Sequence, residues 1–409
     1  MKRVFFINRY FFPDHSATSQ ILSQLAFDLA ESGCTVHVVT SRHLYNNPAA
    51  NLKAEETHRG VVIHRIVTTQ RGRSQLLGRG FDYLSFYLSA WRLLMALADQ
   101  TDVLIPMTDP PLLSILAWRV SRRRRSYVIN WLQDIYPEVA TELGVPLIKG
   151  PLGKLLSLAR NASLRDAATN VVVGPLMAQK VLKLGISSDR INVIPNWCDD
   201  EAIVPVANDQ NPLRAEWHLQ GKFVVGYSGN LGRAHEFETV FAAAEQLRNN
   251  SAIVFLLIGA GHGSAELARR VQEAGLEDKF RFLPYQTNEN LRYSLSVPDV
   301  HWISLRPQLE GLIVPSKVYG IAAAGRPIIA VTAKDGEIAR LVKAHECGVI
   351  VEPGNADEMA KAIVHLATND DARIRMGLRA RAMLDAEFTR RHAFRRWRNV
   401  VNRLLAAEA

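Results

Sequence analysis

Cysteine is scarce in this sequence. The 409 residues contain three, Cys34, Cys198 and Cys347, far apart and at no spacing typical of a metal site. An odd, scattered set argues against a disulfide scaffold and a zinc cluster, and indicates a reducing compartment. The start of the chain also lacks the long apolar run of a signal peptide, since Arg9 interrupts it. No uncharged apolar stretch is long enough to span a bilayer, so we expect a cytoplasmic globular protein.

Acidic residues are fewer than basic ones, 40 against 49, and the excess is uneven. Residues 1–200 hold 23 basic and 16 acidic residues, residues 201–389 hold 20 and 23, and residues 390–409 hold 6 and 1. This distribution indicates that one lobe meets an anionic surface, for which nucleic acid and an anionic membrane are the candidates. A general preference for arginine, without functional meaning, is the alternative.

Short apolar runs alternate with helical patterns, and the cycle occurs twice. Predicted strands lie at 4–8, 35–40, 61–67, 103–107, 127–130, 170–174 and 191–195, then at 223–229, 252–259, 280–284, 300–304, 327–331 and 348–352. Most are continuous apolar runs, typical of parallel strands buried on both faces. The run at 61–67 alternates and is predicted at a sheet edge. Because strand–helix alternation builds βαβ units, we predict an α/β fold of two Rossmann-like, doubly wound domains facing across a cleft.

The end of the chain predicts one more helix, whose capping residue is Thr389. Phe394, Trp397, Val401 and Leu404 are spaced to form one face of it. We expect this helix to cross back to the first domain. The predicted domains are therefore residues 1–200 with helix 389–409, and residues 201–388.

The helix predicted over 81–98 is apolar apart from a narrow polar stripe. It suits either a buried core helix or a helix that dips into a membrane interface. Arg71, Arg73 and Arg79 precede it, and a further run of four, Arg122 to Arg125, follows the next predicted helix. Clustered arginine favours contact with anionic lipid, although such runs are also common in solvated loops.

Glycines mark several turns between strands and helices. Gly259, Gly261 and Gly263 open a helix, where backbone can approach a phosphate closely. A dinucleotide site would need an acid at the end of the next strand, but that strand ends in Leu283 and Pro284. The pattern therefore disfavours a dinucleotide oxidoreductase.

Two further segments predict a site for a sugar diphosphate. In SGNLGRAHEFETV, Gly229 and Gly232 open a turn and Arg233 supplies a cation. In LEGLIVPSKVYGIAAAGRP, Glu310 precedes a glycine turn and Lys317 begins a helix of small residues. A carboxylate can accept hydrogen bonds from sugar hydroxyls, while backbone amides and the two cations hold phosphate.

With these motifs the chain resembles the retaining glycosyltransferases of family 4, which have the GT-B fold, and within them the bacterial exopolysaccharide branch that includes colanic-acid-type transferases. The resemblance runs through YFFPD, WLQDIYPE, IPNW, SGNLGRAHEFET and VPSKVYGIAAAGRP, in that order along nearly the whole chain. It implies transfer of a hexose, without metal or cofactor, from a UDP- or GDP-linked sugar. The implied acceptor is a polyprenyl-diphosphate-linked saccharide at the inner face of the cytoplasmic membrane. It implies no nucleic-acid partner.

The resemblance also assigns residues. The catalytic residues would be Glu310, Asp134, Arg233 and Lys317. The donor would contact Gly229, Asn230, Gly232, Arg233, Gly259, Gly261, Glu310, Gly311, Leu312, Ile313, Val314, Ser316 and Lys317. The acceptor would contact Ser16, Ala17, Thr18 and Gln133. No set of His, Asp and Glu shows metal-ligand spacing, and His235 is predicted to be a loop residue.

The sequence departs from the family at the second glutamate of its Glu-x7-Glu pair, where Val318, or Gly320 in a shifted alignment, stands instead. Gln133 replaces a common histidine, and Ser16 to Thr18 replace a glycine pair. Two alternatives stay open: a sugar-nucleotide epimerase, which has the same fold, and a binding protein without catalysis, which the missing second glutamate suggests.

Overall fold

The computed structural model describes residues 2–47, 49–71, 76–145 and 150–406, which form two compact units. Unit 1 contains residues 1–195 and 393–409, and unit 2 contains residues 196–392. The expected boundaries were at residues 200 and 388. The predicted membrane contact Arg73 and the last three residues of the predicted helix 389–409 lie outside the described residues.

Unit 1 is built on one sheet with the strand order β3-β4-β2-β1-β5-β6-β7-β8. The paired strands run parallel except β3 and β4, which are antiparallel. The strands are β1 (Arg3–Ile7), β2 (Thr35–Ser41), β3 (Glu55–His58), β4 (Val61–Ile66), β5 (Val103–Pro106), β6 (Tyr127–Leu132), β7 (Thr169–Val172) and β8 (Ile191–Val193). The helices are α1 (Ala17–Glu31), α2 (Leu76–Leu97), α3 (Leu113–Arg124), α4 (Glu138–Glu142), α5 (Pro151–Asp166), α6 (Pro175–Lys183) and most of α15 (Arg390–Ala406).

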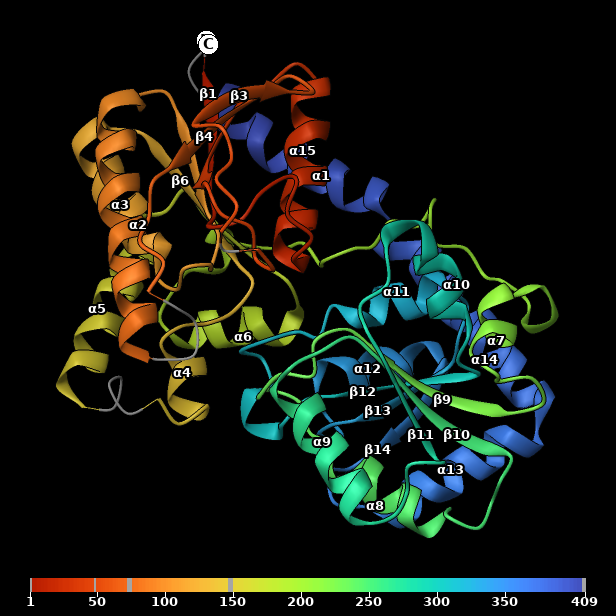
Figure 1. Ribbon diagram of the computed structural model, residues 1–409. Coiled ribbons are helices and arrows are strands. Elements are labelled where there is room, and N and C mark those ends of the chain that lie inside the picture. The colour runs from red at the N-terminus through yellow and green to blue at the C-terminus, as the bar shows by residue number, and fades with distance from the viewer. Residues whose placement is uncertain (1, 48, 72–75, 146–149, 407–409) are drawn as a thin grey trace. The chain divides into compact units, whose positions relative to one another are not determined.

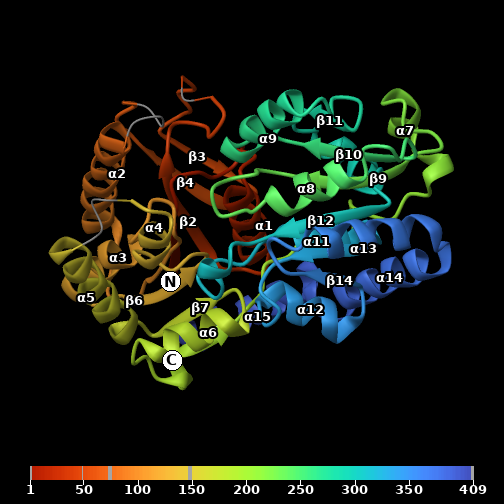
Figure 2. The same cartoon turned by 90° about the horizontal axis from the view of Figure 1, so that it is seen from below.

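Unit 2 has a fully parallel sheet in the order β11-β10-β9-β12-β13-β14, with helices on both faces (Figures 1 and 2). Its strands are β9 (Phe223–Ser228), β10 (Ile253–Ile258), β11 (Phe280–Leu283), β12 (Val300–Ser304), β13 (Ile328–Val331) and β14 (Gly348–Val351). Its helices are α7 (Pro212–Glu216), α8 (Glu238–Gln246), α9 (His262–Glu273), α10 (Leu291–Ser296), α11 (Lys317–Ala323), α12 (Glu337–His345), α13 (Ala356–Thr368) and α14 (Asp370–Met383). The chain order reverses between β9 and β12, and ligands of such sheets bind beyond the carboxyl ends of the strands at this reversal.

The predicted α/β fold with two parallel sheets is confirmed, and every predicted strand is present. The prediction that the run at 61–67 lies at an edge is wrong, because β4 is paired on both sides, with β2 and with β3. Its polar residues are buried through specific partners. Arg65 pairs with Glu56 at 2.7 Å, and His64 lies 2.9 Å from the ring of His37.

Helix α2 has two different faces. Phe86, Ala90 and Leu94 are fully buried in the core of unit 1, which they share with residues of α3 and the sheet. The predicted polar stripe binds the preceding segment: Ser89 donates to the carbonyl oxygen of Val67 at 3.0 Å, and Asp82 accepts from Thr69 at 2.8 Å. The stripe therefore serves packing within unit 1.

Helix α15 passes from unit 2 into unit 1, as its apolar face predicts. Trp397 is fully buried, and its ring centroid lies 4.6 Å from that of Trp131 on β6. Arg398 pairs with Asp28 of α1 at 3.0 Å, and α1 and α15 lie side by side in Figure 1. Residues from the end of the chain thus complete the core of unit 1.

The buried Trp397 provides a test of this arrangement. Replacing it with Ala should lower the free energy of unfolding of unit 1 by about 3–5 kcal/mol, because a large cavity opens against Trp131. Urea unfolding measures the change. Arg395→Ala, at an exposed position of the same helix, is the matched control and should change stability by less than about 0.5 kcal/mol. Equal effects of the two substitutions would contradict the packing role of Trp397.

Candidate functional site

Two glycine turns meet at the carboxyl ends of β9 and β10. The amide of Gly229 donates to the carbonyl oxygen of Ile258 at 2.8 Å, and the amide of Leu231 donates to that of Ala260 at 2.9 Å. Gly229 has φ +122°, a backbone conformation that residues with a Cβ rarely adopt. The structure therefore brings together the predicted donor residues Gly229, Asn230, Gly259 and Gly261.

The second turn needs glycine because the first one touches it. A Cβ at Gly259 would lie 2.4 Å from the carbonyl oxygen of Gly229, and one at Gly261 would lie 2.4 Å from Oδ1 of Asn230. The amide of Gly263 already donates to the carbonyl oxygen of Leu231 at 2.8 Å. Close packing between the two turns thus accounts for glycines that the sequence suggested for phosphate contact.

Lys317 reaches from the start of α11 to the first of these turns. A Cβ at Gly229 would lie 2.9 Å from Cε of Lys317. Its ammonium nitrogen lies 3.1 Å from Nε2 of His235 and 5.3 Å from the ring centroid of Tyr227. Burial lowers the pKa of Lys317 to about 8. Within the described ranges no carboxylate forms an ion pair with it.

Arg233 is exposed in the turn that follows Gly232, two residues before His235. It forms no ion pair with any acidic residue that the structure describes. One partly buried cation and one exposed cation therefore flank the same turn. This arrangement favours an anionic ligand.

Glu310 has a clear structural role. One carboxylate oxygen accepts from the hydroxyl of Thr332, and the other accepts from the amide of Glu337, the first residue of α12, at 3.1 Å. A Cβ at Gly336 would lie 2.3 Å from this carboxylate. Burial raises the pKa of Glu310, and the bond from Thr332 opposes the rise. Sequence reasoning missed this cap, although a glycine at the capping position, Gly336, signals a helix start without a cap of its own.

The segment that links Glu310 to Lys317 packs against unit 2. Gly311 has φ +73°, and Leu312 and Val314 are buried. The remaining predicted donor residues of this segment, Ile313 and Ser316, are partly buried. Val318, at the place of the second glutamate in the family pattern, is fully buried in α11. That position therefore serves the core.

Asp134 follows β6 in unit 1 and accepts from the hydroxyl of Thr108 at 3.4 Å. Burial, with the nearby charge of Asp109, raises the pKa of Asp134 to about 6. It lines a small, mostly apolar cavity of about 20 Å³, together with Tyr136 and Arg160. Gln133 beside it is buried.

The other predicted acceptor residues, Ser16, Ala17 and Thr18, form the start of α1. Asp14 organises this turn. It accepts from the amide of Ser16 at 2.8 Å through one carboxylate oxygen and from the amide of Tyr45 through the other. The carboxylate of Asp14 therefore holds the amide of Ser16 where the family has its glycine pair, and ties this turn to Tyr45.

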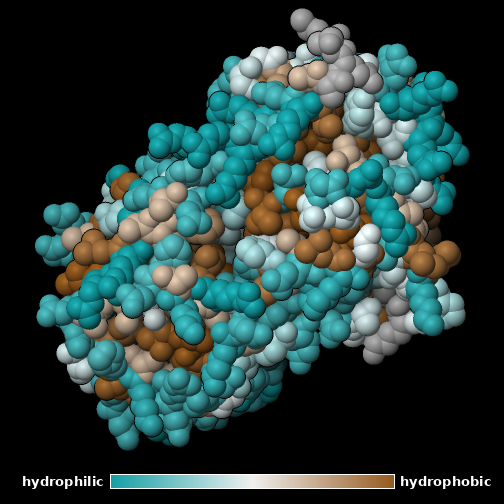
Figure 3. Space-filling model, turned by 180° about the vertical axis from the view of Figure 1, so that it is seen from behind, coloured by the Kyte–Doolittle hydropathy of each residue, from teal (hydrophilic) through white to brown (hydrophobic). Residues whose placement is uncertain are grey.

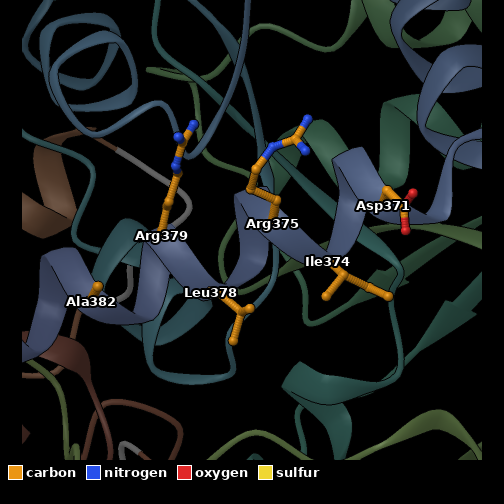
Figure 4. Close-up of a pocket in the computed structure, with 6 residues that line it drawn as sticks. All are labelled: Asp371, Ile374, Arg375, Leu378, Arg379 and Ala382. Atoms are coloured by element: carbon orange, nitrogen blue, oxygen red, sulfur yellow. The ribbon is translucent and has the colours of Figure 1, made fainter.

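Two other hollows in the described surface contain no predicted site residue. One lies along α14 and is lined by that helix alone, with Ile374 and Leu378 projecting to one side and Arg375 and Arg379 to the other (Figure 4). Another lies between α8 and α13. Neither converges polar groups as the glycine turns do.

Residues 17–197 match the glycosyl transferase 4-like domain, and residues 209–383 match the glycosyl transferases group 1. The chain is 28% identical over 233 residues to the putative colanic acid biosynthesis glycosyl transferase WcaI of Escherichia coli, a match that covers 55% of this chain and 57% of that protein.

Solved structures show the same fold. Sucrose-phosphate synthase from Thermosynechococcus elongatus matches with a TM-score of 0.80 and 18% identity, over the whole of both chains. HepE from Anabaena, solved with UDP-glucose, matches with a TM-score of 0.73 and 15% identity, over 98% of this chain and 100% of that one. The fold is that of the GT-B glycosyltransferases. The chain belongs to the glycosyltransferases, with a 4-like domain in unit 1 and a group 1 domain in unit 2.

Substitutions at Glu310 can separate its observed capping role from its predicted role toward the donor sugar. Glu310→Gln keeps one acceptor oxygen for α12 and should change the free energy of unfolding by less than about 1 kcal/mol. If the carboxylate also orients the donor sugar, the same variant should lower the rate of glycosyl transfer roughly a hundredfold. Glu310→Ala removes the cap altogether and should cost about 1 kcal/mol more. If the transfer rate of the two variants falls only in proportion to their melting temperatures, the predicted role of Glu310 toward the donor is wrong and its capping role alone remains.

Proposed function

We propose that this protein is a retaining, metal-independent glycosyltransferase that moves a hexose from a nucleotide diphosphate sugar to a polyprenyl-diphosphate-linked saccharide during bacterial surface polysaccharide synthesis. The observation that carries the donor class is the ammonium of Lys317, which lies against the Gly229 turn with no carboxylate partner in the described chain. UDP-glucose bound to HepE supports the same class of donor. The similarity to WcaI supports the polysaccharide product.

In the proposed reaction the bond between the anomeric carbon and the phosphate oxygen breaks while a bond to the acceptor oxygen forms on the same face. The acceptor proton passes to the departing phosphate oxygen. Lys317 and Arg233 stabilise the negative charge that develops on the diphosphate. Glu310 orients the donor sugar, and Asp134 and Gln133 contact the acceptor. Two protein cations take the part that a metal ion plays in other transferases.

The two cations define a binding test. Lys317→Ala and Arg233→Ala should each weaken the binding of UDP and GDP about tenfold or more, because each removes a charged contact to phosphate. Binding of the nucleosides alone should not change. Isothermal titration calorimetry measures both. Lys361→Ala, at an exposed lysine on α13, is the control and should bind as the unchanged protein does.

Two outcomes would contradict the proposal. Equal weakening of nucleoside and nucleotide binding would show that the cations do not contact phosphate. Incubation with a nucleotide sugar alone gives the second test. If the sugar is epimerised without any acceptor, the protein is an epimerase and the proposed transferase function is wrong.

We also propose that unit 1 docks on the cytoplasmic face of an anionic membrane. Apolar side chains that are about half exposed or more stand on two helices that both pack against α3: Phe81, Leu84 and Leu88 on α2, and Leu152, Leu155 and Leu158 on α5. Arg122 to Arg125 are exposed at the end of α3. Exposed apolar side chains and exposed arginines on the same unit suit an interface with anionic lipid. None of the helices in the described ranges has the length and apolarity to cross a bilayer.

Figure 3 shows hydrophobic patches among hydrophilic residues on the face seen from behind, so exposed apolar side chains alone do not single out unit 1. The vesicle experiment therefore needs a matched pair in unit 2. Leu155→Ser with Leu158→Ser should weaken binding to phosphatidylglycerol vesicles, whereas Ile374→Ser with Leu378→Ser, two equally exposed residues of α14 (Figure 4), should not.

Charge provides the second arm of the same experiment. Vesicle binding, measured by co-sedimentation, should weaken as salt is raised, because the Debye length falls to about 8 Å at physiological ionic strength. Replacing Arg122 to Arg125 with Gln should weaken it at low salt while leaving nucleotide binding by unit 2 intact. Vesicle binding that changes neither with salt concentration nor with substitution of the arginines or the α5 leucines would contradict membrane docking. It would favour a soluble acceptor.

A further inference from the structure

The ammonium of Lys317 has an unusual partner. It lies 3.1 Å from Nε2 of His235, a predicted loop residue. The other titratable group against it is the phenol of Tyr227 on β9, whose ring centroid lies 5.3 Å away.

The imidazole of His235 is itself held in one orientation. Its Nδ1 lies 2.6 Å from the carbonyl oxygen of Ser304, at the end of β12. A carbonyl oxygen only accepts, so Nδ1 carries the proton and Nε2 is left as an acceptor. The ammonium of Lys317 therefore donates to Nε2.

The loop that carries His235 is anchored on both sides of the ring. The amide of Glu236 donates to the hydroxyl of Ser304 at 3.1 Å, and the amide of Arg306 donates to the carbonyl oxygen of Ala234 at 3.0 Å. The amide of His235 donates to the carbonyl oxygen of Gly232 at 3.1 Å. The orientation of the ring is thus fixed by β12, across the point where the strand order reverses.

We propose that His235 is a positioning residue: its Nε2 holds the ammonium of Lys317 against the Gly229 turn, in place to meet the diphosphate of the donor. This inference rests on the proposed function and adds the residue that presents the cation. A neutral acceptor orients an ammonium and leaves its charge available. A carboxylate in the same place would neutralise that charge and compete with the ligand.

The electrostatics agree with a neutral ring. Burial, and then the charge of Lys317, lower the pKa of His235 to about 3, so the imidazole stays uncharged through the physiological range. Burial alone lowers the pKa of Lys317 to about 8. Tyr227 stays protonated there, because burial raises its pKa well above the usual value. Lys317 is therefore the group that changes charge near pH 8, and anion affinity should fall as the pH rises through that value.

Inorganic pyrophosphate is a suitable probe, since it carries the diphosphate without base, sugar or acceptor. At pH 7.5, calorimetry on the full chain should show that His235→Phe weakens pyrophosphate binding about tenfold, as loss of a hydrogen bond to a charged group predicts. His235→Gln returns an acceptor and should recover part of the affinity. His365→Phe, at an exposed histidine of α13, is the matched control and should have no effect.

A double-mutant cycle separates positioning from general damage. In the Lys317→Ala background, His235→Phe should cause no further loss, because the group that it positions is gone. An equal loss in both backgrounds would overturn the proposal, as would unchanged binding by His235→Phe in the otherwise unaltered chain. If the unaltered chain binds no pyrophosphate, the proposed donor site fails as well, so the two failures are distinguishable.

Two further readouts would not respond to a merely structural histidine. The affinity of the unaltered chain for pyrophosphate should fall as the pH rises past about 8. The same series measured on Lys317→Ala corrects for titration of pyrophosphate itself. In His235→Phe the fall in affinity should occur at lower pH. Nitrogen-15 NMR of the unaltered chain should show His235 protonated at Nδ1 at pH 7.5. A ring protonated at Nε2, or a fall that stays in place in His235→Phe, would overturn the proposal without reliance on the stability of any one variant.

Discussion

The donor site proposed in unit 2 depends on one cation that no carboxylate in the described chain neutralises. Lys317 lies partly buried beside the turn after β9, and a neutral imidazole is its hydrogen-bond partner. Burying a charge without a counter-charge costs free energy, which is why its pKa falls. A bound diphosphate would supply the missing counter-charge. The same unfavourable burial that weakens the free protein would thus strengthen its attraction for an anionic donor.

Much of the fold could be predicted, because buried parallel strands are continuous apolar runs that contrast with the helices between them. Strand β3 could not. Its residues Glu55 to His58 are polar, and it forms only because β4 offers an unpaired edge. Because β3 pairs with β4, the prediction that residues 61–67 lie at a sheet edge is wrong. The polar residues of β4, His64 and Arg65, are adjacent in the chain, and each is buried against a partner on a neighbouring strand, His37 of β2 and Glu56 of β3.

The types of residue in the candidate site could be predicted from the sequence. The physical reasons why several of them stand there could not. Glycine, lysine and arginine near strand ends suggested phosphate, and the structure gathers Gly229, Gly259 and Lys317 in one place. Yet Gly259 is small because a neighbouring turn touches it, and Glu310 caps α12. These reasons depend on contacts between segments about 30 residues apart. The pairing of His235 with Lys317, 82 residues apart, has no local signal at all.

The passage of α15 from unit 2 into unit 1 has a consequence for how the chain acquires its structure. A ribosome makes Trp131 long before Trp397, and all of residues 196–392 in between. Unit 2 is therefore the first unit whose residues are all available, although unit 1 begins the chain. Domains generally fold as units during synthesis, N-terminal first. Here the nascent first unit must wait, with the face around Trp131 uncovered, until the last helix emerges and closes it.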